Sequence, residues 1–165
     1  MQEQLTELVT VLRQEIEQYR RLLAVVRRER GRIVRGELAG VVEAVRKKEA
    51  ITQELANLEA ARAALLDRLR EELGDPGSPF TLAQAAALAP AKHGQTLREI
   101  VIEFRGVVGL LMAANEVNRT LLDRSLDFVQ GSLELFRTVA TAPAYTSGGR
   151  FGEAARSATA LNQTA

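Results

Sequence analysis

The side chains that could do chemistry are few, and they are scattered along the chain. There is no cysteine, and the single histidine, His93, has no carboxylate or second histidine at metal-ligand spacing. Ser125 and Ser132 have no base near them in the sequence that would activate a nucleophile. No phosphate-binding loop, dinucleotide fingerprint or nucleophile elbow occurs. We therefore expect no enzymatic activity, no catalytic residue, no metal site and no cofactor.

Basic residues gather at residues 27–30 and continue at Arg32 and Arg35. Such a cluster can contact phosphate, but Glu29 interrupts it and no aromatic residues are interleaved for base stacking. With a net charge of only +1, the pattern favours a salt-bridged helical face and no nucleic-acid partner. Because no run of ~18 apolar residues occurs and the first residues are polar, we expect neither membrane insertion nor a signal peptide, and predict a cytoplasmic protein.

Asn115 and Asn118 are the polar residues that most need an explanation. Both fall on an apolar stripe that follows steps of three and four residues from Leu97 to Val129. Buried asparagines in a helical seam set register at some cost in stability. One interpretation is that the pair bonds a facing helix and sets the register of the third long helix. The other is that the asparagines mark where the seam opens to receive another helix.

Two long helices must come before this segment. The first, over about residues 2–35, has a coiled-coil seam, and Gly36 suits its C-terminus because glycine adopts a left-handed conformation without strain. The second, over about residues 37–73, follows after a turn so short that the two helices must be antiparallel neighbours. The sequence therefore predicts an elongated helical hairpin.

The remaining elements follow a break at residues 74–79, which are rich in glycine and proline. Thr81 and Gln84 have capping-box spacing and open a short helix over residues 82–89, which Pro90 ends. A long helix over about residues 92–141 carries Gly106 and Gly109, for which close packing against a neighbouring backbone is the simplest interpretation. We thus predict an all-α fold: one helical domain, residues 1–141, with a third long helix beside the hairpin, followed by a flexible glycine-rich tail, residues 142–165.

At this point the chain resembles the FlgN-type flagellar type III export chaperones, over about residues 5–151. The resemblance depends on Glu15 and residues 19–23 in the first helix, on residues 36–38, 48–55 and 58–62 around the second, and on residues 115–128 in the third. A segment that begins with Tyr145 and has glycine three residues later, Gly148, ends the match. The tail after Gly149 is longer and richer in glycine than is usual in the family.

The resemblance implies a bacterial cytoplasmic chaperone that binds the terminal helices of hook-associated proteins, which form the hook–filament junction. It prevents their premature assembly and delivers them to the cytoplasmic domain of the flagellar type III export gate. Tyr145 matches a tail tyrosine with which the family docks on that gate. The alternative is a structural or adaptor coiled-coil protein that oligomerises through the same faces, and a weak homodimer is compatible with either function.

An exposed amphipathic helix can accept a client helix on its apolar face. We expect the third long helix to pack on the hairpin through residues 97–111 and to bind clients through residues 117–139. The predicted client contacts are Leu121, Leu126, Phe128, Val129, Leu133, Phe136 and Val139.

Overall fold

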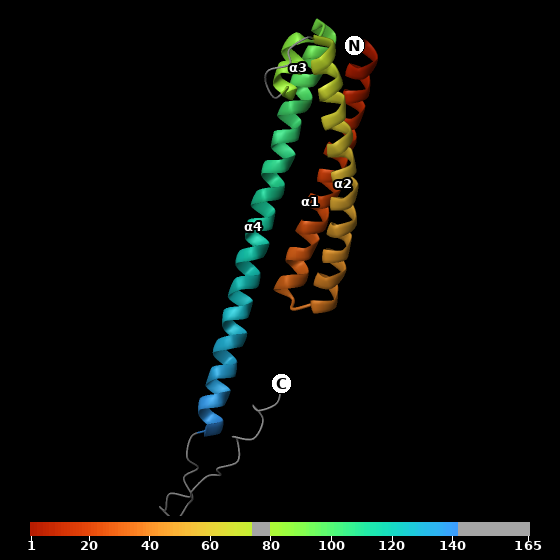
Figure 1. Ribbon diagram of the computed structural model, residues 1–165. Helices are drawn as coiled ribbons and strands as arrows, with labels where there is room; N and C mark the ends of the chain where they lie inside the picture. Colours follow the sequence, from red (N-terminus) through yellow and green to blue (C-terminus); the bar gives the residue numbers. More distant parts are fainter. Residues whose placement is uncertain (74–79, 142–165) are drawn as a thin grey trace, which may run out of the picture. The chain divides into compact units, whose positions relative to one another are not determined.

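The computed structural model describes residues 1–73 and 80–141. Its helices are α1 (Gln2–Val34), α2 (Leu38–Leu73), α3 (Leu82–Leu88) and α4 (Ala91–Thr141), so the predicted all-α fold is confirmed (Figure 1). Each helix begins and ends within one residue of its predicted bounds. The predicted tail, including Tyr145, lies outside the described residues, as do the side chains of residues 73 and 139–141.

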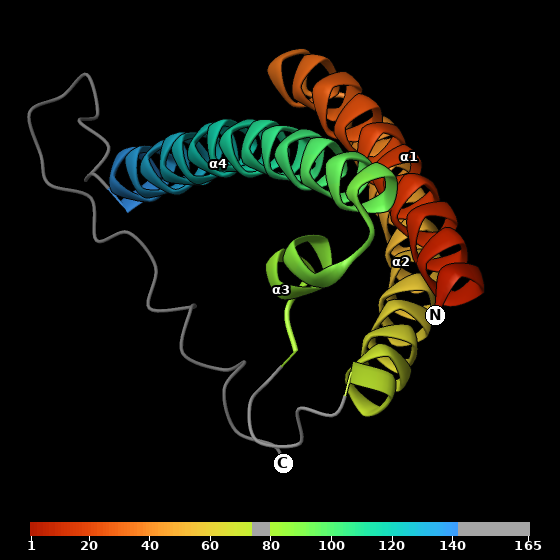
Figure 2. The ribbon, with the colours of Figure 1, turned by 90° about the horizontal axis from the view of Figure 1, so that it is seen from above.

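A glycine turn joins α1 to α2. Gly36 has a positive φ of 68°, as predicted, and its backbone N–H donates to the carbonyl of Ile33 over 3.0 Å. The next N–H, of Glu37, donates to the carbonyl of Arg32 over 2.9 Å. These bonds satisfy the last carbonyls of α1 and reverse the chain within three residues. Helices α1 and α2 therefore run antiparallel, side by side (Figures 1 and 2).

Helix α3 is short and packs through small side chains. The Thr81 hydroxyl accepts from the Gln84 N–H while the Gln84 side chain accepts from the Thr81 N–H, so the predicted capping box is confirmed. Ala85 and Ala86 are buried. At Gly94 of α4, an added Cβ would lie only 2.6 Å from the Ala86 carbonyl oxygen. The absence of a side chain at Gly94 is therefore what lets α3 approach α4 so closely.

The main core lies where α1, α2, α3 and α4 meet. Leu8, Leu12, Leu69 and Leu97 are its largest fully buried apolar side chains. A second cluster forms further along, where Leu23 and Val26 of α1 meet Leu111 of α4. The first part of α4 is thus packed on the hairpin, as the stripe predicted for residues 97–111.

The chain divides into two compact units, Met1–Leu122 and Asp123–Ala165. The division falls inside α4, whereas the sequence placed the end of the helical domain at residue 141. In the first unit α4 has buried partners on the hairpin. The described part of the second unit is the remainder of α4, and it is treated separately below.

Candidate functional site

One buried ion pair of the first unit joins Glu15 of α1 to Arg62 of α2. The Arg62 Nε donates to Glu15 Oε1 over 3.0 Å, and the Glu15 side chain is completely buried. The second carboxylate oxygen, Oε2, has no hydrogen-bond partner within the described part of the chain. Burial raises the pKa of Glu15 above its ordinary value, and the nearby positive charge of Arg62 counteracts part of that rise.

Two aromatic rings extend this ion pair to α4. The Tyr19 hydroxyl donates to Glu59 Oε1 over 3.0 Å, and its ring meets Phe104 edge-on at 5.2 Å between centroids. The Arg62 guanidinium carbon lies 5.9 Å from the centre of the Phe104 ring, within cation–π range. Burial and the hydrogen bond to Glu59 raise the pKa of Tyr19 to about 12. The cluster therefore links α1, α2 and α4 through polar and aromatic contacts.

A second polar cluster lies around Glu29 of α1. Lys48 of α2 donates to both carboxylate oxygens of Glu29, over 2.7 and 2.9 Å. Asn118 of α4 donates from Nδ2 to Glu29 Oε2 over 3.0 Å and to the carbonyl of Val26 over 2.9 Å. Glu29 is thus not part of an exposed basic face but is buried between three helices. This correction follows from the phase of α1, which turns Glu29 inward while the neighbouring arginines face water.

The two clusters occupy alternate layers of a regular three-helix arrangement. On α1 the inward residues at seven-residue steps are Leu8, Glu15, Leu22 and Glu29; on α2 they are Leu69, Arg62, Leu55 and Lys48; on α4 they are Leu97, Phe104, Leu111 and Asn118. Helices α1 and α4 run in the same direction, and α2 runs opposite (Figure 1). Leucine layers therefore alternate with polar layers every two turns of helix.

This alternation specifies the register of the hairpin. If α2 slipped by one heptad against α1, each buried glutamate would face a leucine, and Arg62 and Lys48 would lose their partners. A buried charge without a partner costs several kcal/mol, far more than a surface ion pair contributes. Because α4 also contacts both polar layers, the same pattern aligns it with the hairpin. Seven-residue spacing from Leu8 and Leu22 would have placed both glutamates inside, a signal that our sequence analysis did not use.

The structure separates the two seam asparagines. Asn118 is 4% exposed and bonds a facing backbone carbonyl, as one interpretation expected. Asn115 is exposed, so the pair does not share one buried seam. The register-setting role predicted for both remains a prediction.

The expected close packing at Gly106 and Gly109 is wrong for this structure. A Cβ at either position would meet nothing within 4 Å. Both glycines face away from the hairpin because the stripe that packs on it runs along the other side of α4.

The described part of the second unit carries a continuous apolar surface. We call it the terminal face; its members are each more than half exposed and are Leu126, Phe128, Val129, Leu133, Leu135 and Phe136. Phe128 is 77% exposed and Phe136 is 72% exposed. The face includes five of the seven predicted client contacts. Of the other two, Leu121 is half-buried in the first unit, and the Val139 side chain lies outside the described ones.

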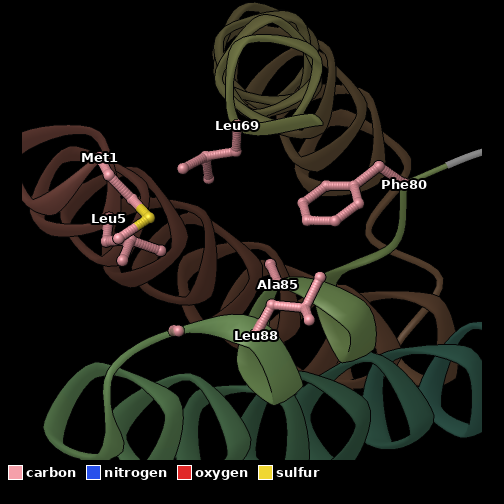
Figure 3. Close-up of a pocket in the computed structure, with 7 residues that line it drawn as sticks. Met1, Leu5, Leu69, Phe80, Ala85 and Leu88 are labelled. Carbon is pink, nitrogen blue, oxygen red and sulfur yellow. The ribbon is translucent and has the colours of Figure 1, made fainter. Parts of the chain in front are cut away.

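Other features of the described chain offer little for small-molecule chemistry. A cavity of about 10 Å³, lined by Met1, Leu5, Leu69, Phe80, Ala85, Leu88 and Ala89, lies under α3 (Figure 3). That volume holds about one water molecule, and the lining is apolar. His93 lies near the Thr6 hydroxyl, at 3.4 Å. Among residues 1–73 and 80–141, no group of histidine and carboxylate side chains could hold a metal ion, and no helix could span a membrane.

Comparison with known proteins assigns the family. No curated protein and no solved structure matches the chain. A family model described as FlgN protein matches residues 1–151, which include both polar layers and the terminal face. The chain therefore belongs to the FlgN family of flagellar export chaperones.

Proposed function

We propose that this protein binds the terminal helices of hook-associated proteins in the bacterial cytoplasm, prevents their premature assembly and delivers them to the flagellar export gate. The observation that carries the proposal is the terminal face, where six large apolar side chains of one helix are exposed together. An apolar patch of this kind marks an interaction surface in a soluble protein. Because the chain has no recognised nucleotide-binding motif, binding would protect the client by mass action alone.

The chemistry of the terminal face suits an amphipathic helix. At about 100° per residue, its apolar side chains cover about 180° of the circumference of α4, whereas one packed neighbour needs about 100°. The opposite side carries Arg124, Asp127 and Glu134, all exposed. A client helix would therefore lie on the apolar side with its own polar side facing water, which is the helix-in-groove mode of recognition.

Phe128→Asp tests the client surface. Titration calorimetry with the hook-associated protein of the same organism measures the affinity, and circular dichroism confirms the helix content. Aromatic residues near the centre of an interface commonly contribute 2 kcal/mol or more, so we expect affinity to fall at least about tenfold. Retained affinity in a folded Phe128→Asp variant would show that clients bind elsewhere.

A matched control exists on the same helix. Ile102 is 71% exposed and lies in the first unit, outside the terminal face. Ile102→Asp makes the same kind of change at a similarly exposed apolar position, so we expect client affinity to stay as in the wild type. An equal loss in both variants would point to a general effect of the added charge.

Tyr145 is proposed to dock on the cytoplasmic domain of the export gate. Tyr145→Ala should weaken binding of the chaperone–client complex to that domain while the complex itself survives. Light scattering addresses the alternative function. A monomer or weak dimer that gains the mass of one client supports the chaperone, and a constitutive large oligomer supports a structural coiled coil.

A further inference from the structure

The terminal face lacks a cover among the described residues of its own unit. Its six apolar side chains are all more than half exposed, and a free chain would present all of them to water. The residues outside the described part begin immediately after this face. Residues 142–165 follow Thr141 directly, so they are 24 residues of chain tethered to the end of the surface that needs covering.

The length of this segment matches the distance to be covered. At 1.5 Å per residue, Phe136 lies about 8 Å and Leu126 about 22 Å before Thr141 along the helix. An extended chain spans up to about 3.3 Å per residue, so Phe151 can lie as much as about 33 Å from Thr141. Phe151 can therefore reach every member of the terminal face with slack in the connection.

The composition of the segment selects Phe151 as the residue that binds. It is the only phenylalanine after Phe136, and glycines at 148, 149 and 152 leave the backbone around it free to turn. Tyr145 is also aromatic, but burying its hydroxyl against leucine, valine and phenylalanine would leave that group without a partner. Phe151 carries no such cost.

We propose that, in the client-free protein, residues 142–165 fold back so that Phe151 covers the terminal face and competes with the client helix. This inference builds on the proposed function, because it describes how that client surface is regulated. The tether supplies an effective concentration in the millimolar range, so even a weak contact is well populated. A client must displace the cover, and its apparent affinity falls in proportion to the open fraction.

The cover can be detected without any client. Because the chain has no cysteine, Ala154→Cys carries a single spin label on the full-length protein. We expect the label to broaden the methyl signals of Leu126, Val129 and Leu133 in NMR spectra. Adding Phe151→Ser should reduce this broadening to the level of an unattached tail, whereas Tyr145→Ser, a matched aromatic change, should not. Equal broadening with and without Phe151 would overturn the proposal.

Two further measurements separate the other outcomes. Spin-labelled chains are mixed with isotope-labelled chains that lack the cysteine; broadening in this mixture would identify a second copy as the occupant and would overturn the intramolecular cover. Phe151→Ser should also bind the hook-associated client about two- to fivefold more tightly. If the label detects the cover but no client binds, the proposed function fails and the inference survives. If the client binds and Phe151→Ser changes neither signal, the inference alone fails.

Discussion

Removing Arg62 should make the stability of this protein depend on pH through Glu15. In the Arg62→Met variant, Glu15 keeps its buried position but loses the guanidinium that bonds its Oε1. The carboxylate can then either remain charged without a partner or bind a proton. Because burial already raises the pKa of Glu15 in the wild type, we expect the variant to take up a proton on folding.

Proton uptake limits the cost of the substitution. From an ordinary pKa of 4.5, protonating Glu15 costs about 3.4 kcal/mol at pH 7 and about 0.7 kcal/mol at pH 5, at about 1.36 kcal/mol per pH unit. The folded-state pKa lies above the unfolded one, so stability is greatest below pH 4.5 and falls as pH rises through the folded pKa. The variant should therefore lose up to about 2.7 kcal/mol more at pH 7 than at pH 5.

Urea denaturation followed by circular dichroism measures these free energies of unfolding. The matched background is Glu15→Gln, which keeps the size of the side chain and cannot ionise. In that background Arg62→Met should cost the same at pH 5 and pH 7, because only packing and the contact with Phe104 are lost. The difference between the two backgrounds cancels the titration of all other groups. A cost of Arg62→Met that is independent of pH in the presence of Glu15 would refute the argument.

Two further predictions concern the second polar layer and the glycines of α4. Lys48→Met leaves Glu29 buried without its cation and should lower the free energy of unfolding by about 3 kcal/mol at pH 7, whereas Asn118→Leu, which also removes an unsatisfied buried oxygen, should cost less than about 1 kcal/mol; equal losses in urea denaturation would show that the cation has no special role. Gly94→Ala places a Cβ 2.6 Å from a backbone oxygen of α3 and should destabilise by about 1–3 kcal/mol, while Gly106→Ala, in open space, should stabilise by up to about 1 kcal/mol. A loss for Gly106→Ala in thermal melts would indicate a partner helix on that side of α4.

Much of the fold could be predicted because its signals are local. The left-handed Gly36, the capping box at Thr81 and the helix bounds each depend on a few neighbouring residues, and the short turn leaves an antiparallel hairpin as the one arrangement available. The terminal face was also predictable in outline. An amphipathic stripe on one helix shows which side chains share a side, whatever that side later contacts.

The polar layers were beyond this local reasoning. The sequence alone places Asn115 and Asn118 on neighbouring lines of α4, about 60° apart around the helix. Which of them is buried depends on the direction from which the hairpin approaches, and only the folded arrangement decides it. The same holds for Glu15 and Glu29, which are ordinary charged residues until Arg62 and Lys48 are brought opposite them from α2.

The sequence by itself thus determined the helices, their order, the hairpin and the apolar side of the last helix, because hydrogen bonding within a helix and hydrophobic periodicity are properties of one segment. The tertiary structure decided which polar residues are buried, which glycines pack and how the three long helices are aligned. Those properties depend on the phase of one helix against another, and the α-helical repeat of 3.6 residues drifts by about 20° per heptad relative to a seven-residue pattern. Over three or four heptads that drift is enough to move a residue from the seam to the surface.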